Sequence, residues 1–231
     1  MSKSAVALIT VMTIFDRGHH TAILLLIILH RKKKFKQKPQ DMKRLIFTTL
    51  LMLSLSVFLN AQVKYHASYT KISVAGTSTL HNWDMASEKA NCDISFDFDG
   101  ANITGLSSLL FTVQAETLKS DSKGLDKNAY KALNSEKFPA ISFTSNFANI
   151  RSNGPNSYVI SAKGKLTISG VSKEVWLAGV STVNPADMSI QTTGSAKMKM
   201  SEYSVEPPSF MFGAMKTGDE ITVKFNVTLK K

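Results

Sequence analysis

The chain has 231 residues, of which 43% are hydrophobic, and a formal net charge of +11 at pH 7. The positive charge is concentrated early: ten of the 28 Lys and Arg but only two of the 17 Asp and Glu precede residue 62, which leaves 18 basic and 15 acidic residues, a net charge of +3. Basic and acidic residues are thus nearly balanced after residue 61, which excludes the basic surface that a nucleic-acid partner requires.

Residues 42–61 are predicted to be a secretory signal peptide. Lys43 and Arg44 form a positive n-region, and the uninterrupted apolar run over residues 45–59 has the length of an h-region. Ala61 is the small residue that signal peptidase needs, although Leu59 departs from the A-x-A pattern. We therefore expect cleavage near Ala61 and a mature protein that is periplasmic or secreted.

Residues 1–41 precede that signal. They contain an apolar run at 21–29 and a basic cluster at 31–38, which together could form a tail that contacts membrane or nucleic acid. A start at Met42 would give an ordinary N-terminal export signal. We therefore interpret residues 1–41 as a mis-assigned start or a disordered leader.

From residue 62 onward, apolar and polar residues alternate, which is typical of antiparallel strands with one buried and one solvated face. Gly, Pro and Asn-rich turns separate the alternating runs. Eight such strands can close on themselves and so remove their exposed edges. The sequence predicts an all-β, lipocalin-like antiparallel barrel as a single domain over residues 62–231. We expect about eight strands, over 65–76, 88–99, 105–118, 141–150, 158–169, 173–183, 188–200 and 221–230.

One segment is predicted to be helical. Residues 125–138 place Leu125, Ala129, Ala132 and Leu133 on one helical face, and Pro139 ends the helix. We expect this short helix to lie on the barrel or across its mouth. The chain's single cysteine, Cys92, excludes an intramolecular disulfide, so burial must stabilise the fold.

Four segments in order carry a resemblance to a known family. They are Gly76 to Trp83 (GTSTLHNW), 125–133 running into 137–145, 164–173, and 207–213 followed by 216–219. With them the chain resembles the YceI-like polyisoprenoid-binding proteins over almost all of residues 62–231. The resemblance implies an extended barrel with an apolar tunnel for a polyprenyl chain, in a periplasmic or secreted protein. We expect no cofactor and no catalytic step. The form His81-Asn82-Trp83 is one that we associate with relatives of unknown ligand.

The tunnel lining is expected to consist of large apolar side chains at inward positions. An isoprenoid chain offers almost nothing to hydrogen-bond, so recognition must rest on buried apolar area. A closed β core that is simply filled by the same side chains is the alternative. The predicted lining residues are Phe96, Phe98, Phe111, Val113, Phe143, Phe147, Trp176, Met198, Met200 and Phe225.

His81, Asn82 and Trp83 are candidates for the tunnel mouth, where they could bind a polar headgroup. Alternatively, the Trp belongs to the core and the other two side chains satisfy backbone groups of a turn. A lipid-modifying enzyme with His81 in its site, and a structural module that binds nothing, are the other functional hypotheses. His66 and His81 are too few and too isolated to predict a metal site.

Phe210, Met211 and Phe212 follow two prolines and form a bulky apolar loop. Such a loop could plug one end of the barrel or touch a membrane while ligand transfers. A long-chain lipid is thus the expected partner, with transient membrane contact through this loop and a homodimer as further hypotheses.

Overall fold

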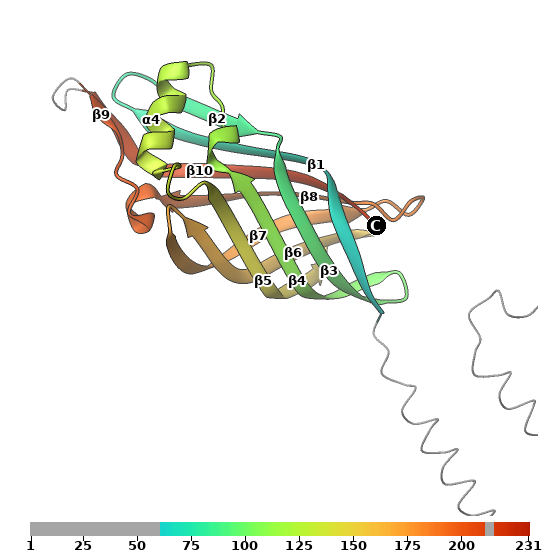
Figure 1. The fold of residues 1–231 in the computed structure, drawn as a ribbon. Coiled ribbons are helices and arrows are strands. Elements are labelled where there is room, and N and C mark those ends of the chain that lie inside the picture. The colour runs from blue at the N-terminus through green and yellow to red at the C-terminus, as the bar shows by residue number, and fades with distance from the viewer. Residues whose placement is uncertain (1–60, 211–214) are drawn as a thin grey trace, which may run out of the picture. The chain divides into compact units, whose positions relative to one another are not determined.

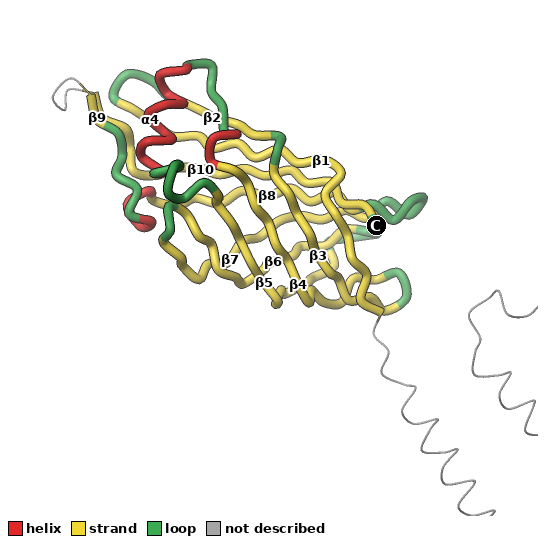
Figure 2. Tube along the Cα trace, viewed as in Figure 1, coloured by secondary structure: helices red, strands yellow, loops and turns green. Residues whose placement is uncertain are grey.

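A computed structural model describes residues 61–210 and 215–231. The predicted leader and nearly all of the predicted signal peptide lie outside these residues, as do Met211 and Phe212. The described chain is mostly strand, with one short α-helix (Figures 1 and 2). Its elements are β1 (Ala61–Ser78), β2 (Trp83–Ser87), β3 (Ala90–Asp99), β4 (Asn102–Gln114), η2 (Ala115–Thr117), α4 (Lys123–Leu133), β5 (Ala140–Ser152), β6 (Ser157–Ile168), β7 (Val171–Val183), β8 (Ile190–Lys199), η3 (Met200–Tyr203), β9 (Ser209–Phe210) and β10 (Met215–Lys230).

The eight long strands pair antiparallel with their neighbours and close into a barrel. The order is β2-β1-β3-β4-β5-β6-β7-β8-β10-β9, and an additional pairing of β1 with β10 completes the circle. This seam runs from His66 opposite Lys230 to Ser78 opposite Thr217. The predicted eight-stranded barrel and its helix are confirmed, and two short strands, β2 and β9, were not predicted.

The long strand β1 has two partners on its other side. Its first part pairs with β3, between Ala61 and His66, and its second part pairs with β2, between Ile72 and Gly76. Thr70 lies between the two ladders, where its hydroxyl donates to the Ala90 carbonyl and accepts from the Ala90 N–H, at 3.0 and 3.1 Å. These bonds satisfy buried backbone groups at the break between β2 and β3.

One end of the barrel, which we call the closed end, is filled by side chains. It lies at the β3–β4, β5–β6 and β7–β8 turns. The rings of Tyr65 and Phe98 stack there with centroids 6.2 Å apart, and Phe96 meets both rings edge-on. The Tyr158 hydroxyl donates to Asn102 across two of the turns, at 3.3 Å. Aromatic packing therefore seals the barrel at this end.

Helix α4 covers the opposite end, the cap end, together with β2 and β9 (Figure 1). Ser122 caps its N-terminus by accepting from the Leu125 N–H at 3.4 Å, and Asn134 ends it in the left-handed conformation at φ 51°. The helix therefore stops before the predicted residue 138. Residues 115–139, which connect β4 to β5 and include η2 and α4, are the cap segment below.

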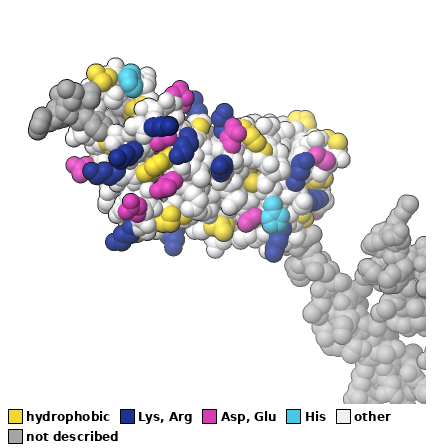
Figure 3. Space-filling view, turned by 45° about the horizontal axis from the view of Figure 1, so that its top comes forward, with side chains coloured by type: hydrophobic (Ala, Val, Ile, Leu, Met, Phe, Trp, Pro, Cys, Tyr) yellow, Lys and Arg dark blue, Asp and Glu magenta, His cyan; other side chains and the backbone are white. Residues whose placement is uncertain are grey.

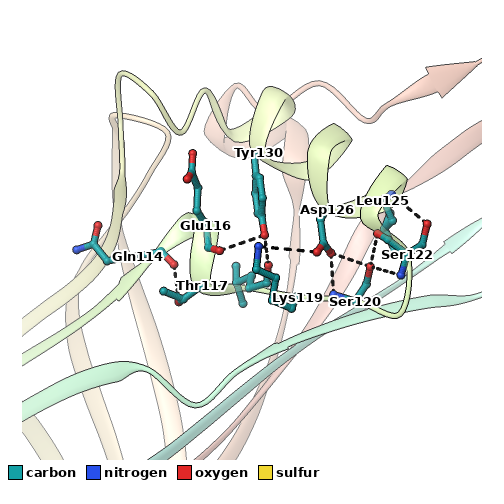
Figure 4. A network of polar contacts seen from close by, with 10 residues as sticks. Gln114, Glu116, Thr117, Lys119, Ser120, Ser122, Leu125, Asp126 and Tyr130 are labelled. Carbon is teal, nitrogen blue, oxygen red and sulfur yellow. Dashed lines mark hydrogen bonds and ion pairs between the residues drawn. The ribbon is translucent and has the colours of Figure 1, made fainter.

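Polar contacts hold α4 to the preceding part of the cap segment (Figure 4). The buried carboxylate of Asp126 accepts from the N–H and the hydroxyl of Ser120, at 2.7 and 2.8 Å. One turn later the Tyr130 hydroxyl lies 2.6 Å from the Leu118 carbonyl, to which it donates. The helix is therefore fixed by its polar side, which leaves its apolar side free to face the barrel.

The ladder between β7 and β8 is short. It pairs Gly179 to Val183 with Ile190 to Gly194, whereas β8 pairs with β10 along its full length. Tyr203 and Val205, in and just after η3, are buried at 2% and 3% exposure. They belong to an apolar cluster against which Val175 and Leu177 of β7 and Met198 of β8 pack.

We predict that Asp126→Ala lowers the free energy of unfolding by about 1–3 kcal/mol, because it leaves the Ser120 N–H and hydroxyl without their acceptor. Urea unfolding followed by circular dichroism measures the change. Asp121→Ala, which removes an exposed carboxylate from the same loop, is the matched control and should change stability by less than about 0.5 kcal/mol. Equal effects of the two substitutions would contradict the stabilising role of the Asp126 carboxylate.

Candidate functional site

An apolar cavity of about 290 Å³ occupies the barrel between the closed end and the cap segment. Side chains of β1 to β8 and β10 form its wall, and α4 lies over it. Its volume is close to the lower end of the range of about 300–1,000 Å³ for small-molecule sites. Polar side chains are few in the lining: Asn128, Ser181, Thr192, Lys199, Tyr203 and Thr217.

The roof of the cavity is the inner face of α4. Leu125, Ala129, Ala132 and Leu133 face the cavity, as the helical pattern of the sequence predicted. Asn128 is the polar residue on this face. Of the two positions expected for the helix, on the barrel or across its mouth, the structure shows the second.

Seven of the ten predicted lining residues reach the cavity. Phe143 and Val113 are 3% exposed and Phe96 is 1% exposed, so their side chains are enclosed by the wall. The other four are partly buried. Binding of a ligand by these residues stays a prediction. The seven are Phe96, Phe111, Val113, Phe143, Met198, Met200 and Phe225.

Phe98 does not line the cavity. It lies one alternation beyond Phe96 in the aromatic cluster of the closed end. Phe98 therefore faces inward, as predicted, but it helps to seal the closed end and lies outside the cavity.

The predicted inward orientation of Phe147 is wrong. A β-bulge between Ser145 and Phe147 shifts the register of β5 against β6, so Ala148 and Ile150 face the core instead. The Ser145 hydroxyl fixes the bulge by donating to the Lys163 carbonyl at 2.7 Å and accepting from the Phe147 N–H at 3.2 Å. Phe147 is consequently 51% exposed.

The inward orientation suggested for Trp176 is also wrong. Val175 and Leu177 face inward on β7, so the residue between them must face outward. Trp176 is 50% exposed and packs edge-on against Phe147 with centroids 6.3 Å apart. The two aromatic rings therefore form a pair on the outer wall.

Among the three predicted mouth residues, Trp83 alone lines the cavity. Its ring lies across Gly76, its partner on β1, where an added Cβ would come within 2.7 Å of the indole. Its Nε1–H donates to the Thr77 carbonyl at 3.1 Å. Glycine at position 76 is thus required for the close approach of the indole.

His81 and Asn82 are exposed in the turn between β1 and β2. The His81 ring nitrogen Nδ1 lies 2.8 Å from the Asn82 carbonyl, and the His81 N–H donates to the Ser78 hydroxyl at 3.2 Å. The contacts made by His81 are therefore those of a residue that stabilises a turn.

Sequence reasoning missed two polar features of the barrel interior. Ser181 and Thr192 face the cavity from adjacent strands, with their hydroxyl oxygens 2.8 Å apart. Tyr65 is fully buried at the closed end, where its hydroxyl has no partner among the described residues. Burial raises the pKa of that hydroxyl. The sequence signal for Ser181 and Thr192 was a hydroxyl side chain at an inward position of each strand.

The outer surface carries both signs of charge. Basic and acidic side chains are interspersed over the visible face in Figure 3. Exposed ion pairs include Lys163 with Glu174 at 2.8 Å and Lys197 with Glu220 at 3.2 Å. Within residues 61–210 and 215–231 no helix is long and apolar enough to span a membrane, and no cluster of His, Cys, Asp and Glu could hold a metal.

Known proteins were compared with the chain by family, by fold and by sequence. The family described as YceI-like domain matches residues 62–229. BcnA of Burkholderia cenocepacia is similar in fold, with a TM-score of 0.55 and 21% identity over 69% of this chain and 95% of that one. A polyisoprenoid binding domain from Saccharophagus degradans, implicated in plant cell wall breakdown, has a TM-score of 0.56 and 9% identity over 72% and 97% of the two chains. No curated protein matches the chain.

We predict that the Cys92 thiol is almost inert in the folded protein. It lines the cavity, and burial, with a smaller contribution from Asp93, raises its pKa to about 12. At about pH 8 roughly one molecule in 10,000 then carries the reactive thiolate. Reaction with a chromogenic disulfide reagent should be slower by at least about a hundredfold than in guanidinium chloride. Equal rates in the two conditions would show that the thiol is exposed.

Proposed function

The chain belongs to the YceI-like domain family, and from that premise we propose that it is an exported lipid-binding protein that holds a long apolar chain of the polyisoprenoid type. The observation that carries the proposal is the apolar cavity inside the barrel, sealed by aromatic rings at one end and covered by α4 at the other. Its role is carriage or sequestration, without a catalytic step. The predicted signal peptide supports the export.

The energetics of the cavity suit a hydrocarbon ligand. Burial gains about 0.8 kcal/mol per CH₂, so a chain of about 20 carbons gains roughly 16 kcal/mol of gross transfer free energy. Association and chain ordering oppose this by several kcal/mol. The apolar wall alone therefore supplies enough free energy, and selectivity follows from how length and width fit the cavity.

Two further features favour a flexible lipid over a rigid small molecule. Met198 and Met200 contribute unbranched thioether side chains to the wall, which can repack around an irregular chain. The Saccharophagus degradans domain of similar fold is described as polyisoprenoid binding. A methyl-branched chain therefore fits both the wall and the family.

The enzyme hypothesis gains no support at His81. Its ring is exposed in a turn and bonds to a neighbouring carbonyl, and His81 does not line the cavity. Transient membrane contact through Phe210, Met211 and Phe212 and a homodimer stay predictions.

We predict that binding changes the fluorescence of Trp83. The chain has two tryptophans, of which Trp83 lines the cavity and Trp176 lies outside, so Trp176→Phe isolates the cavity signal. Titration of this variant with a polyprenol in detergent should give a saturable change in emission. Trp83→Phe, which retains only the outer tryptophan, is the control and should not respond. A wild-type protein that purifies without lipid and whose Trp83 never responds would defeat the proposal.

We further predict that filling the cavity blocks binding. Ala196→Phe adds a ring inside the barrel and should weaken polyprenol binding at least about tenfold, or about 1.4 kcal/mol, while thermal stability is maintained because the ring fills empty space. Ala178→Phe adds the same ring to an exposed outward position on β7 and should leave binding unchanged. Unaltered binding by a folded Ala196→Phe protein would place the ligand elsewhere.

A further inference from the structure

Near the closed end, the apolar cavity contains one pair of hydroxyl side chains. Ser181 and Thr192 are direct cross-strand partners on β7 and β8, and their oxygens are 2.8 Å apart. Both residues line the cavity. Ser181 is 0% exposed, whereas Thr192 is partly exposed at an inward position of β8. Thr192 is therefore the member of the pair that presents surface to the cavity.

The bond between the two hydroxyls uses only one of their two hydrogens. Either oxygen can be the donor, since neither side chain has a second partner among the described residues. A buried hydroxyl that donates to nothing costs about 1–3 kcal/mol. The pair therefore retains one hydrogen to donate, next to the surface that Thr192 presents to the cavity.

Two glycines shape the wall at this point. A Cβ on Gly194 would overlap the Phe225 ring and come within 2.5 Å of the Ala178 carbonyl, so the ring lies flat on the glycine. A Cβ on Gly179 would come within 3.2 Å of the Thr192 methyl group. The two glycines thus accommodate Phe225 and the Thr192 methyl beside the hydroxyl pair.

The charge of the lining restricts which group the hydroxyl can receive. Lys199, at the cap end of β8, is the one charged residue in the cavity wall that the structure describes. An anionic headgroup near Thr192 would be buried without a counter-charge, at a cost of several kcal/mol. The group beside Thr192 must therefore be a neutral hydrogen-bond acceptor.

We propose that the Ser181–Thr192 pair is a polar subsite that binds a neutral oxygen of the ligand, a hydroxyl or carbonyl, deep in the cavity. The inference rests on the proposed function and deepens it: a neutral prenyl lipid enters oxygen first, whereas a prenyl phosphate enters tail first and leaves its charge at the cap end. The pair thereby distinguishes a neutral prenyl lipid from a prenyl phosphate with the same hydrocarbon chain.

The test compares three ligands of one chain length: farnesol, the oxygen-free farnesene, and farnesyl phosphate. Affinities are measured by Trp83 fluorescence in the Trp176→Phe protein, with and without Ser181→Ala and Thr192→Val together. Thr193→Val, at the adjacent outward position, is the matched control. Replacement of both hydroxyls by groups of similar shape leaves no orphaned partner, so the fold should be retained, which thermal unfolding verifies.

We expect the protein with both hydroxyls to bind farnesol about two- to tenfold more tightly than farnesene, the size of one neutral hydrogen bond. The double substitution should abolish this preference by weakening farnesol binding alone, and Thr193→Val should leave it intact. A preference that survives the double substitution, or an equal weakening of all three ligands, would overturn the subsite and leave lipid binding intact. Failure of the unsubstituted protein to bind any of the three would instead refute the proposed function.

Discussion

Closure of the sheet by the pairing of β1 with β10 is the interaction on which the rest of the structure depends. The two strands come from opposite ends of the domain, and their register from His66 to Ser78 brings the first and last inward positions side by side. An open sheet would present its apolar face to water or to another layer. Once closed, the same face surrounds an axis that its side chains do not completely fill, and the cavity results.

The two ends of this cavity are built by different means. At the closed end Tyr65, Phe96 and Phe98 belong to the strands themselves, so the seal is continuous with the barrel's core. At the cap end the cover is a separate segment, held through Asp126 and Tyr130 to its own flanking residues. The hydroxyl pair lies near the end that cannot open without unfolding the barrel. A ligand that reaches it must therefore pass the cap end first.

Period-two alternation was sufficient to predict the strands and most of the cavity wall, because one face of each strand is buried. It failed at Phe147, where a bulge of one residue exchanges inside for outside, and no local sequence feature marks that bulge clearly. Trp176 lies between Val175 and Leu177, which are also apolar, so the run does not by itself show which residues face inward, and the structure places Trp176 outward. Ser181 and Thr192 could not be paired from the sequence, since their contact depends on the register of β7 against β8.

The short ladder between β7 and β8 affects the circumference of the barrel differently at its two ends. Toward the cap end the ladder stops, and residues of both strands pack against an apolar cluster that includes Tyr203 and Val205. Expansion of the wall there would break apolar contacts but no ladder hydrogen bond between the two strands. The circumference is thus fixed by backbone pairing near Ser181 and is adjustable beside α4. A ligand bound as proposed would have its deeper end in a part of the barrel whose width is fixed and its outer end in a part that is less constrained.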